Sequence, residues 1–166
     1  MLVGDSFVHG ACVNRPNDIS SNIRRLSKKS VLNLGYGGSA PLIYYATLRE
    51  YLNDNVKKVI FVFYEGNDLI DLTDEINNKI LTQYLDNFSF SQNLKSKQKE
   101  IDRLGNLLIN QNQDTIDTRK NFNFIKFIKI YNLRHLYIKE FKKIKKTNTA
   151  KNLKYFEEIL KQTKDL

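Results

Sequence analysis

Ser6 is the residue of this chain whose surroundings best suit a nucleophile. It follows Gly4 and Asp5 in a short stretch that ends at Gly10. A serine hydroxyl is a weak nucleophile, so it needs an exposed turn that a base and an oxyanion site can both reach. Gly4 and Gly10 allow the backbone to bend there. Because Gly, Asp and Ser are also common turn formers, the tripeptide by itself equally fits an ordinary turn.

Two further turns carry groups that donate hydrogen bonds. Gly-Tyr-Gly-Gly-Ser-Ala-Pro at residues 35–41 follows an apolar run at 31–34, and Glu-Gly-Asn-Asp at 65–68 follows an apolar run at 59–64. Glycine N–H groups and a side-chain amide such as that of Asn67 suit the stabilisation of a developing oxyanion. Losing one such donor typically lowers a rate by about 10²–10³.

Three apolar segments predict the strands that must hold these turns. They are residues 2–3, 31–34 and 59–64, and the last is rich in β-branched and aromatic side chains. We expect neighbouring parallel strands with residues 2–3 in the middle. The carboxyl ends of parallel strands share one edge of a sheet, so the three turns should lie together.

Helical spacing separates these strands. Asp18 suits an N-cap for a helix that buries Ile19, Ile23 and Leu26. Pro41 suits the first turn of a second helix that continues to about residue 53. Strands alternating with helices at this spacing predict right-handed βαβ units and an α/β sheet.

The three polar turns, in this order and each after a strand, resemble the first three sequence blocks of the SGNH, or GDSL-type, serine hydrolases. The resemblance implies Ser6 as the nucleophile. It implies the backbone N–H of Gly38 and the amide of Asn67 as oxyanion donors, beside the N–H of Ser6. A shift of register would move the glycine role to Gly35 or Gly37. The residues expected to contact substrate are Asp5, His9, Gly37 and Asp68.

The resemblance also implies a flavodoxin-like three-layer α/β/α fold, here incomplete. It covers about residues 2–71, so we expect one partial SGNH domain over 1–166. The nucleophile and oxyanion blocks occupy 1–71 of it, and a helical insertion and a crossover helix occupy 72–166. Apolar spacing predicts helices within 69–85, 93–108, 122–144 and 152–160. In the last of these helices the apolar positions are Leu153, Phe156, Ile159 and Leu160.

A catalytic base is the missing part. The family carries it in an Asp-x-x-His motif, and this sequence has none. We expect His9 to line the pocket and to act as a base only if its loop folds back. We expect His135 to be an exposed residue of a basic helix. The chain is therefore interpreted as the front part of a larger esterase, deacylase or acyl-transfer enzyme and is itself expected to be nearly inactive.

The expected substrate is a small-molecule or glycan ester, and acylated glycans are suggested by analogy of fold alone. No cofactor and no metal site are expected. Cys12 is the single cysteine, which excludes an internal disulfide and a cysteine-rich metal cage. No apolar run approaches the ~20 residues of a membrane span, and the amino terminus lacks a signal-peptide pattern. The cellular location stays unknown.

The charge of the chain leaves a non-catalytic alternative open. Residues 1–94 carry 9 Lys and Arg against 10 Asp and Glu, whereas residues 95–166 carry 18 against 8. Such a basic half could bind nucleic acid or an anionic membrane. More often it is a set of solvated helix faces. We expect no nucleic-acid partner, and membrane contact of the basic helices is the less favoured possibility.

A dinucleotide site competes for the second turn. Gly35, Gly37 and Ala40 have the spacing of glycines that hold a pyrophosphate at a helix amino terminus. That pattern expects an acidic residue about 20 residues further on. The first acidic residue at the next strand end is Glu65, which lies clearly later.

Overall fold

The structure, a computed structural model, describes residues 1–120 and 149–166, and side-chain surroundings for 1–110 and 149–166. The chain divides into two compact units, one of Met1–Gln92 with Thr147–Leu166 and one of Asn93–Lys146. Each unit is described by itself. Residue 71, the expected internal boundary, lies within helix α4 (Asp68–Glu75), and the predicted single domain stays a prediction.

The centre of the first unit is a small parallel sheet. Strand β1 (Leu2–Val3) pairs in parallel with β2 (Ile60–Phe61), so that Leu2 lies opposite Ile60 and Val3 opposite Phe61. Backbone hydrogen bonds run from Ile60 N–H to Met1 O and from Val62 N–H to Val3 O, both at 2.9 Å. At this coarse level the protein is α/β, as predicted.

The other edge of β1 pairs with the segment around Asn33. Leu2 and Asn33 form a parallel bridge, flanked by hydrogen bonds from Leu2 N–H to Leu32 O (2.8 Å) and from Leu34 N–H to Leu2 O (2.9 Å). The predicted order, with β1 in the middle, is confirmed. Strand β1 has the predicted bounds, whereas the segments predicted at 31–34 and 59–64 are shorter, with an isolated bridge at Asn33 and a strand at Ile60–Phe61, because they pair only with the two residues of β1.

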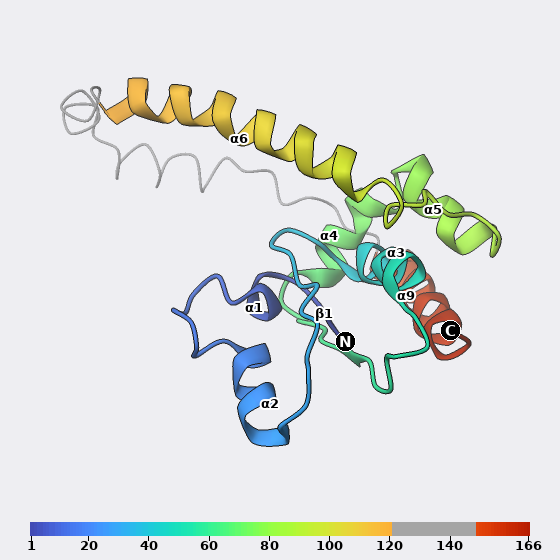
Figure 1. Cartoon of the computed structure of the whole chain (residues 1–166). Helices are drawn as coiled ribbons and strands as arrows, with labels where there is room; N and C mark the ends of the chain where they lie inside the picture. Colours follow the sequence, from blue (N-terminus) through green and yellow to red (C-terminus); the bar gives the residue numbers. More distant parts are fainter. Residues whose placement is uncertain (121–148) are drawn as a thin grey trace. The chain divides into compact units, whose positions relative to one another are not determined.

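Helices cover both sides of these strands. In Figure 1, α1 and α2 lie on one side of β1, and α3 and α9 lie on the other. The bounds of the helices in this unit are α1 Ser6–His9, α2 Ile19–Ser27, α3 Pro41–Tyr51, α4 Asp68–Glu75, α5 Lys79–Asp86 and α9 Thr149–Lys164.

Helix α2 begins as predicted but buries a different face. The Asp18 side chain caps it by accepting the Ser21 N–H at 2.9 Å. Leu26, however, is 73% exposed and Ile19 is 40% exposed, so the expected apolar face is wrong at both positions. The buried residue is Ser20, whose hydroxyl contacts the Asp18 carboxylate and accepts a hydrogen bond from Asn33 at 3.3 Å. Hydrogen bonding rather than apolar packing therefore decides which face of this short helix turns inward.

The core of the unit lies among α3, α4, α5 and α9. Its fully buried side chains include Leu42, Tyr45, Leu72, Tyr84 and Ile159. Ile159 belongs to α9, and the other four precede residue 85. This helix therefore completes a core that the front of the chain begins.

Helix α9 was predicted within residues 152–160, and its helical state is confirmed. Ile159 is buried, but Leu153 and Leu160 are 43% and 38% exposed, so the predicted apolar face is wrong at those two positions. Asn152 is buried instead, and its amide donates to Leu69 O at 2.6 Å and to Thr73 Oγ1 at 2.8 Å. These bonds hold the face of α9 that carries Asn152 against α4. Leu153 and Leu160 therefore lie further outward.

In the second unit the structure describes one long helix, α6 (Gln98–Lys120). It confirms the helix predicted near 93–108. Leu104, Leu107 and Leu108 are roughly half exposed. The basic helix predicted at 122–144 lies outside the described residues. No helix in the described parts of the chain is long and apolar enough to cross a membrane.

Candidate active site

Ser6 is the first residue of α1, directly after the turn that ends β1. Its side chain is half-buried. The neighbouring Asp5 is buried and caps α1 by accepting the Phe7 N–H at 2.9 Å. Asp5 thus has a structural partner, and its predicted contact with substrate stays a prediction. The serine hydroxyl has no hydrogen-bond partner among residues 1–110 and 149–166.

Close packing holds α1 against the ends of the strands. Val8 is fully buried there. A side chain at Gly35 would place its Cβ 2.6 Å from the backbone nitrogen of His9, and one at Gly4 would place its Cβ even closer to Val8 Cγ2. Since real Cβ atoms do not approach so closely, both positions require glycine. The turn that carries Ser6 can therefore sit directly on the sheet.

Asn33 ties the serine turn to the second turn. Its amide donates to Val8 O at 2.7 Å, and its Oδ1 accepts the Gly35 N–H at 2.9 Å. Both partners are backbone groups of segments that carry predicted site residues. Asn33 therefore fixes the position of one turn relative to the other.

The second turn brings Gly37 next to Ser6. A Cβ built on Gly37 would lie 3.6 Å from the Ser6 Cβ, which is ordinary van der Waals contact. The next backbone N–H belongs to Gly38, whose φ of +81° favours glycine and whose surroundings are open. Ser39 anchors the turn by donating to Tyr36 O at 2.5 Å. A Cβ built on Gly38 would meet no atom within 4 Å, so this position of the turn is open.

The third turn lies on the other side of α1. The Tyr64 ring is 5.0 Å from the Phe7 ring, measured between centroids. Asn67 follows as the N-cap position of α4, but its side chain does not cap the helix. Instead its amide donates to Asp71 Oδ2 at 2.7 Å. One amide hydrogen is used in this bond, and the second is left for a ligand.

Asp68 joins the second and third turns beneath the surface. It is fully buried, and its Oδ2 accepts the Tyr64 N–H at 2.9 Å and is 3.2 Å from the Tyr44 hydroxyl, which also contacts Ser39 O at 3.0 Å. Burial raises the pKa of the Asp68 carboxyl, against the opposing effect of these hydrogen bonds. Among the described residues its Oδ1 has no partner. The predicted contact of Asp68 with substrate stays a prediction.

Glu75 supplies the cap that α3 lacks. The capping position of this helix is Ala40, which has no side-chain acceptor. The Glu75 carboxylate accepts the N–H groups of Ala40 (2.7 Å), Leu42 (3.0 Å) and Ile43 (3.3 Å). Burial nevertheless raises the pKa of Glu75 to about 7.

The two histidines, His9 and His135, are the candidates for a base that acts on Ser6. His9 is exposed, and its Nδ1 lies 3.3 Å from Gly35 O. It therefore lies beside the second turn, and its predicted place in the wall of a substrate pocket stays a prediction. No hydrogen bond between His9 and Ser6 occurs, and His135 lies outside the described residues. In residues 1–110 and 149–166 no group of three or more His, Cys, Asp or Glu side chains is placed to hold a metal ion.

The sequence patterns predicted the turns at the ends of the strands. They did not predict the residues whose hydrogen bonds connect those turns to other segments. Side chains that bridge segments distant in sequence are those of Asn33, Ser39, Tyr44 and Glu75. The one local signal was Asn33, a polar residue inside a predicted buried strand. The others lie at positions where a polar or aromatic residue is ordinary.

Comparisons with protein families, curated proteins and solved structures find no match to this chain. A proposal of function therefore rests on the residues themselves.

Proposed function

We propose that the first unit carries the nucleophile and the oxyanion site of an SGNH-type serine ester hydrolase or deacylase. The observation that carries the proposal is the convergence of three turns at one sheet edge. The turns that contain Ser6, Gly37 and Asn67 each follow one of three adjacent parallel segments. A Cβ built on Gly37 would lie 3.6 Å from the Ser6 Cβ, so the second turn passes close to Ser6.

The reaction would begin with attack of Ser6 Oγ on an ester carbonyl carbon. The carbonyl oxygen becomes an oxyanion, and the donors available to it are the backbone N–H groups of Ser6 and Gly38 and the amide of Asn67. A base must take the serine proton, and none of the described residues is bonded to that hydroxyl. A general base typically contributes ~10²–10⁴ in rate, so the chain alone should react slowly. Acylated glycans remain the suggested substrate class.

The dinucleotide alternative is disfavoured at the same turn. A pyrophosphate would need the free N–H groups at the amino terminus of α3. Glu75 already occupies three of them. A pyrophosphate bound there would find these N–H groups already occupied. The negative charge of the Glu75 carboxylate would also repel it. The other alternative, a basic module for nucleic acid or membrane, gains no supporting observation from the described residues.

Fluorophosphonate labelling in the presence of imidazole tests the proposal. The Ser6 oxygen would displace fluoride from phosphorus, and free imidazole would take the proton in place of the missing base. We expect slow labelling of Ser6, acceleration with imidazole concentration, and none in Ser6→Ala. Asn67→Ala should lower the accelerated rate by about 10²–10³, whereas Asn106→Ala, at an exposed position of α6, should leave it unchanged. Equal labelling of other serines, read by peptide mass spectrometry, would contradict the proposal.

A further inference from the structure

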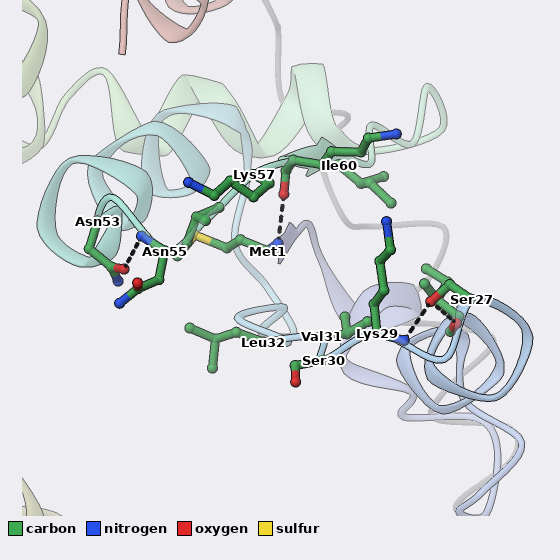
Figure 2. A pocket seen from close by; sticks show the side chains of 13 residues that line it. Met1, Ser27, Lys29, Ser30, Val31, Leu32, Asn53, Asn55, Lys57 and Ile60 are labelled. Atoms are coloured by element: carbon green, nitrogen blue, oxygen red, sulfur yellow. Dashed lines mark hydrogen bonds between the residues drawn. The ribbon is translucent and has the colours of Figure 1, made fainter.

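The two edges of the sheet differ in how their polar side chains are arranged. At the amino ends of the parallel segments, Figure 2 shows a pocket at which Lys29 and Lys57 point to opposite sides. At the carboxyl ends, beneath the turns, a backbone carbonyl and a buried carboxyl group instead meet at one hydroxyl, that of Tyr44. This hydroxyl therefore connects two of the turns that carry the proposed site.

The ring of Tyr44 is fixed by its packing. Tyr44 belongs to α3, is 2% exposed and lies in a core cluster with Val3 of β1 and Leu48 of α3. The Phe61 ring of β2 lies 5.2 Å away between centroids, at an interplanar angle of 72°. Aromatic pairs favour such an edge-to-face arrangement. Contacts with α3 and with both strands therefore determine where the hydroxyl oxygen lies.

The Tyr44 hydroxyl lies within hydrogen-bond distance of a group in each turn. Its oxygen is 3.0 Å from Ser39 O and 3.2 Å from Asp68 Oδ2. Each of these partners is the direct neighbour, along the chain, of a proposed oxyanion donor. Ser39 follows Gly38, and Asp68 follows Asn67. The backbone that carries each donor is thus tied to the same hydroxyl group.

The two partners of Tyr44 also close their own turns. The Asp68 N–H donates to Tyr64 O at 3.1 Å, and Asp68 Oδ2 accepts the Tyr64 N–H at 2.9 Å, so that Asn67 lies within a closed turn. Ser39 closes the second turn similarly, because its N–H and its hydroxyl both donate to Tyr36 O. A change in the position of either partner should therefore move a whole turn.

We infer that Tyr44 is a positioning residue, whose hydroxyl fixes the N–H of Gly38 and the amide of Asn67 relative to each other. The inference rests on the proposed function for the role of these two donors as the oxyanion site. Donors stabilise an oxyanion most when they are in place before the reaction. A misplacement of about 1 Å can lower a rate by about 10²-fold. Tyr44 itself contacts no reacting atom in this scheme.

Tyr44→Phe keeps the ring and removes the hydroxyl. We expect the imidazole-accelerated labelling of Ser6 to slow about tenfold, since both donors remain but lose their fixed separation. Tyr45→Phe is the matched control. Tyr45 is also buried in α3, and its hydroxyl donates to Gln162 Oε1 of α9 at 2.7 Å, so this variant should leave the rate unchanged. Urea unfolding of both variants checks that they fold.

NMR of ¹⁵N-labelled protein reports on the two donors without any reaction. In Tyr44→Phe, the signals of the Gly38 backbone amide and of the Asn67 side-chain amide should both shift. In Tyr45→Phe, neither signal should shift. A general loss of stability would not distinguish the two variants in this way.

A second pair of variants approaches the same link from Asp68 and does not depend on how Tyr44→Phe folds. Asp68→Asn keeps a side-chain oxygen that can accept from the Tyr44 hydroxyl, whereas Asp68→Ala removes it. Ser6 should therefore label faster in Asp68→Asn than in Asp68→Ala.

The outcomes separate this inference from the proposed function. If Ser6 labelled equally fast in the wild-type chain and in Tyr44→Phe, or if both tyrosine variants shifted the same signals, the role of Tyr44 would be wrong and the proposed function would stand. If Ser6 did not label in any variant while the Gly38 and Asn67 signals still moved together, the proposed function would fail and the positioning by Tyr44 would stand.

Discussion

At the scale of single residues, the proposed nucleophile Ser6 and the proposed oxyanion donor Asn67 differ in their hydrogen bonds. The Ser6 hydroxyl has no hydrogen-bond partner among the described residues, and the Asn67 amide donates to Asp71. His9 is the histidine nearest to Ser6 in the sequence, but its Nδ1 lies close to Gly35 O. We therefore predict that His9 is not the base for Ser6.

The substitution His9→Ala tests this assignment. We expect imidazole-accelerated labelling of Ser6 to change less than about twofold, because an exposed side chain without a catalytic contact contributes little to the barrier. Labelling rates with and without imidazole provide the measurement. If His9→Ala abolished the imidazole-independent rate while added imidazole restored it, His9 would be the base, and the chain would be a compact variant of its class.

At the scale of elements, the turns depend on polar side chains that reach between helices. Glu75 of α4 caps α3, which follows the second turn, and Asp68 of α4 binds the third turn and Tyr44 of α3. Both carboxyl groups are buried, and both have a raised pKa. The stability of the contacts between α3 and α4 should therefore depend on pH.

Glu75 predicts the direction of that response. Its pKa rises from 4.5 to about 7 on folding, so between those values the folded state binds more protons than the unfolded state. Its contribution to the free energy of unfolding should therefore fall as pH rises from about 4.5 to 7, by up to about 3 kcal/mol. Glu75→Gln does not titrate. The advantage of the wild-type chain over this variant, measured by urea unfolding, should be larger at pH 5 than at pH 8. An advantage that grows with pH would contradict the assignment.

At the scale of the whole molecule, the first unit is assembled from both ends of the described chain. Ile159 of α9 is buried with Leu72 and Tyr84, and the Phe156 ring stacks on Phe63 at 4.5 Å. Phe63 follows β2 and precedes the third turn. Helix α9 therefore supports the segment that leads to Asn67.

Two adjacent residues of α9 test this support. Ile159→Ala removes a fully buried side chain and should lower the free energy of unfolding by about 2–5 kcal/mol. Leu160→Ala, at a position 38% exposed, should change it by about 0.5 kcal/mol or less. Urea midpoints of the two variants give the comparison. Equal losses would show that α9 is not docked through Ile159.

Local signals in the sequence determined much of the framework. Asp18 and Pro41 marked helix starts correctly, and three apolar runs marked the three neighbouring parallel segments. Such signals succeed because caps and strand runs depend on residues close in sequence. The turn containing Ser6 was found for the same reason.

Tertiary structure alone decided which side chains the core accepts. Leu26 and Leu160 are exposed although their spacing predicted burial, whereas Asn152 and Glu75 are buried although polar. A buried polar group is stable only where hydrogen-bond partners meet it. Here those partners lie far away in sequence, as Leu69 does for Asn152 and Ala40 for Glu75. Hydrophobic spacing within one segment carries no information about them, so only the folded chain could show how the turns are joined.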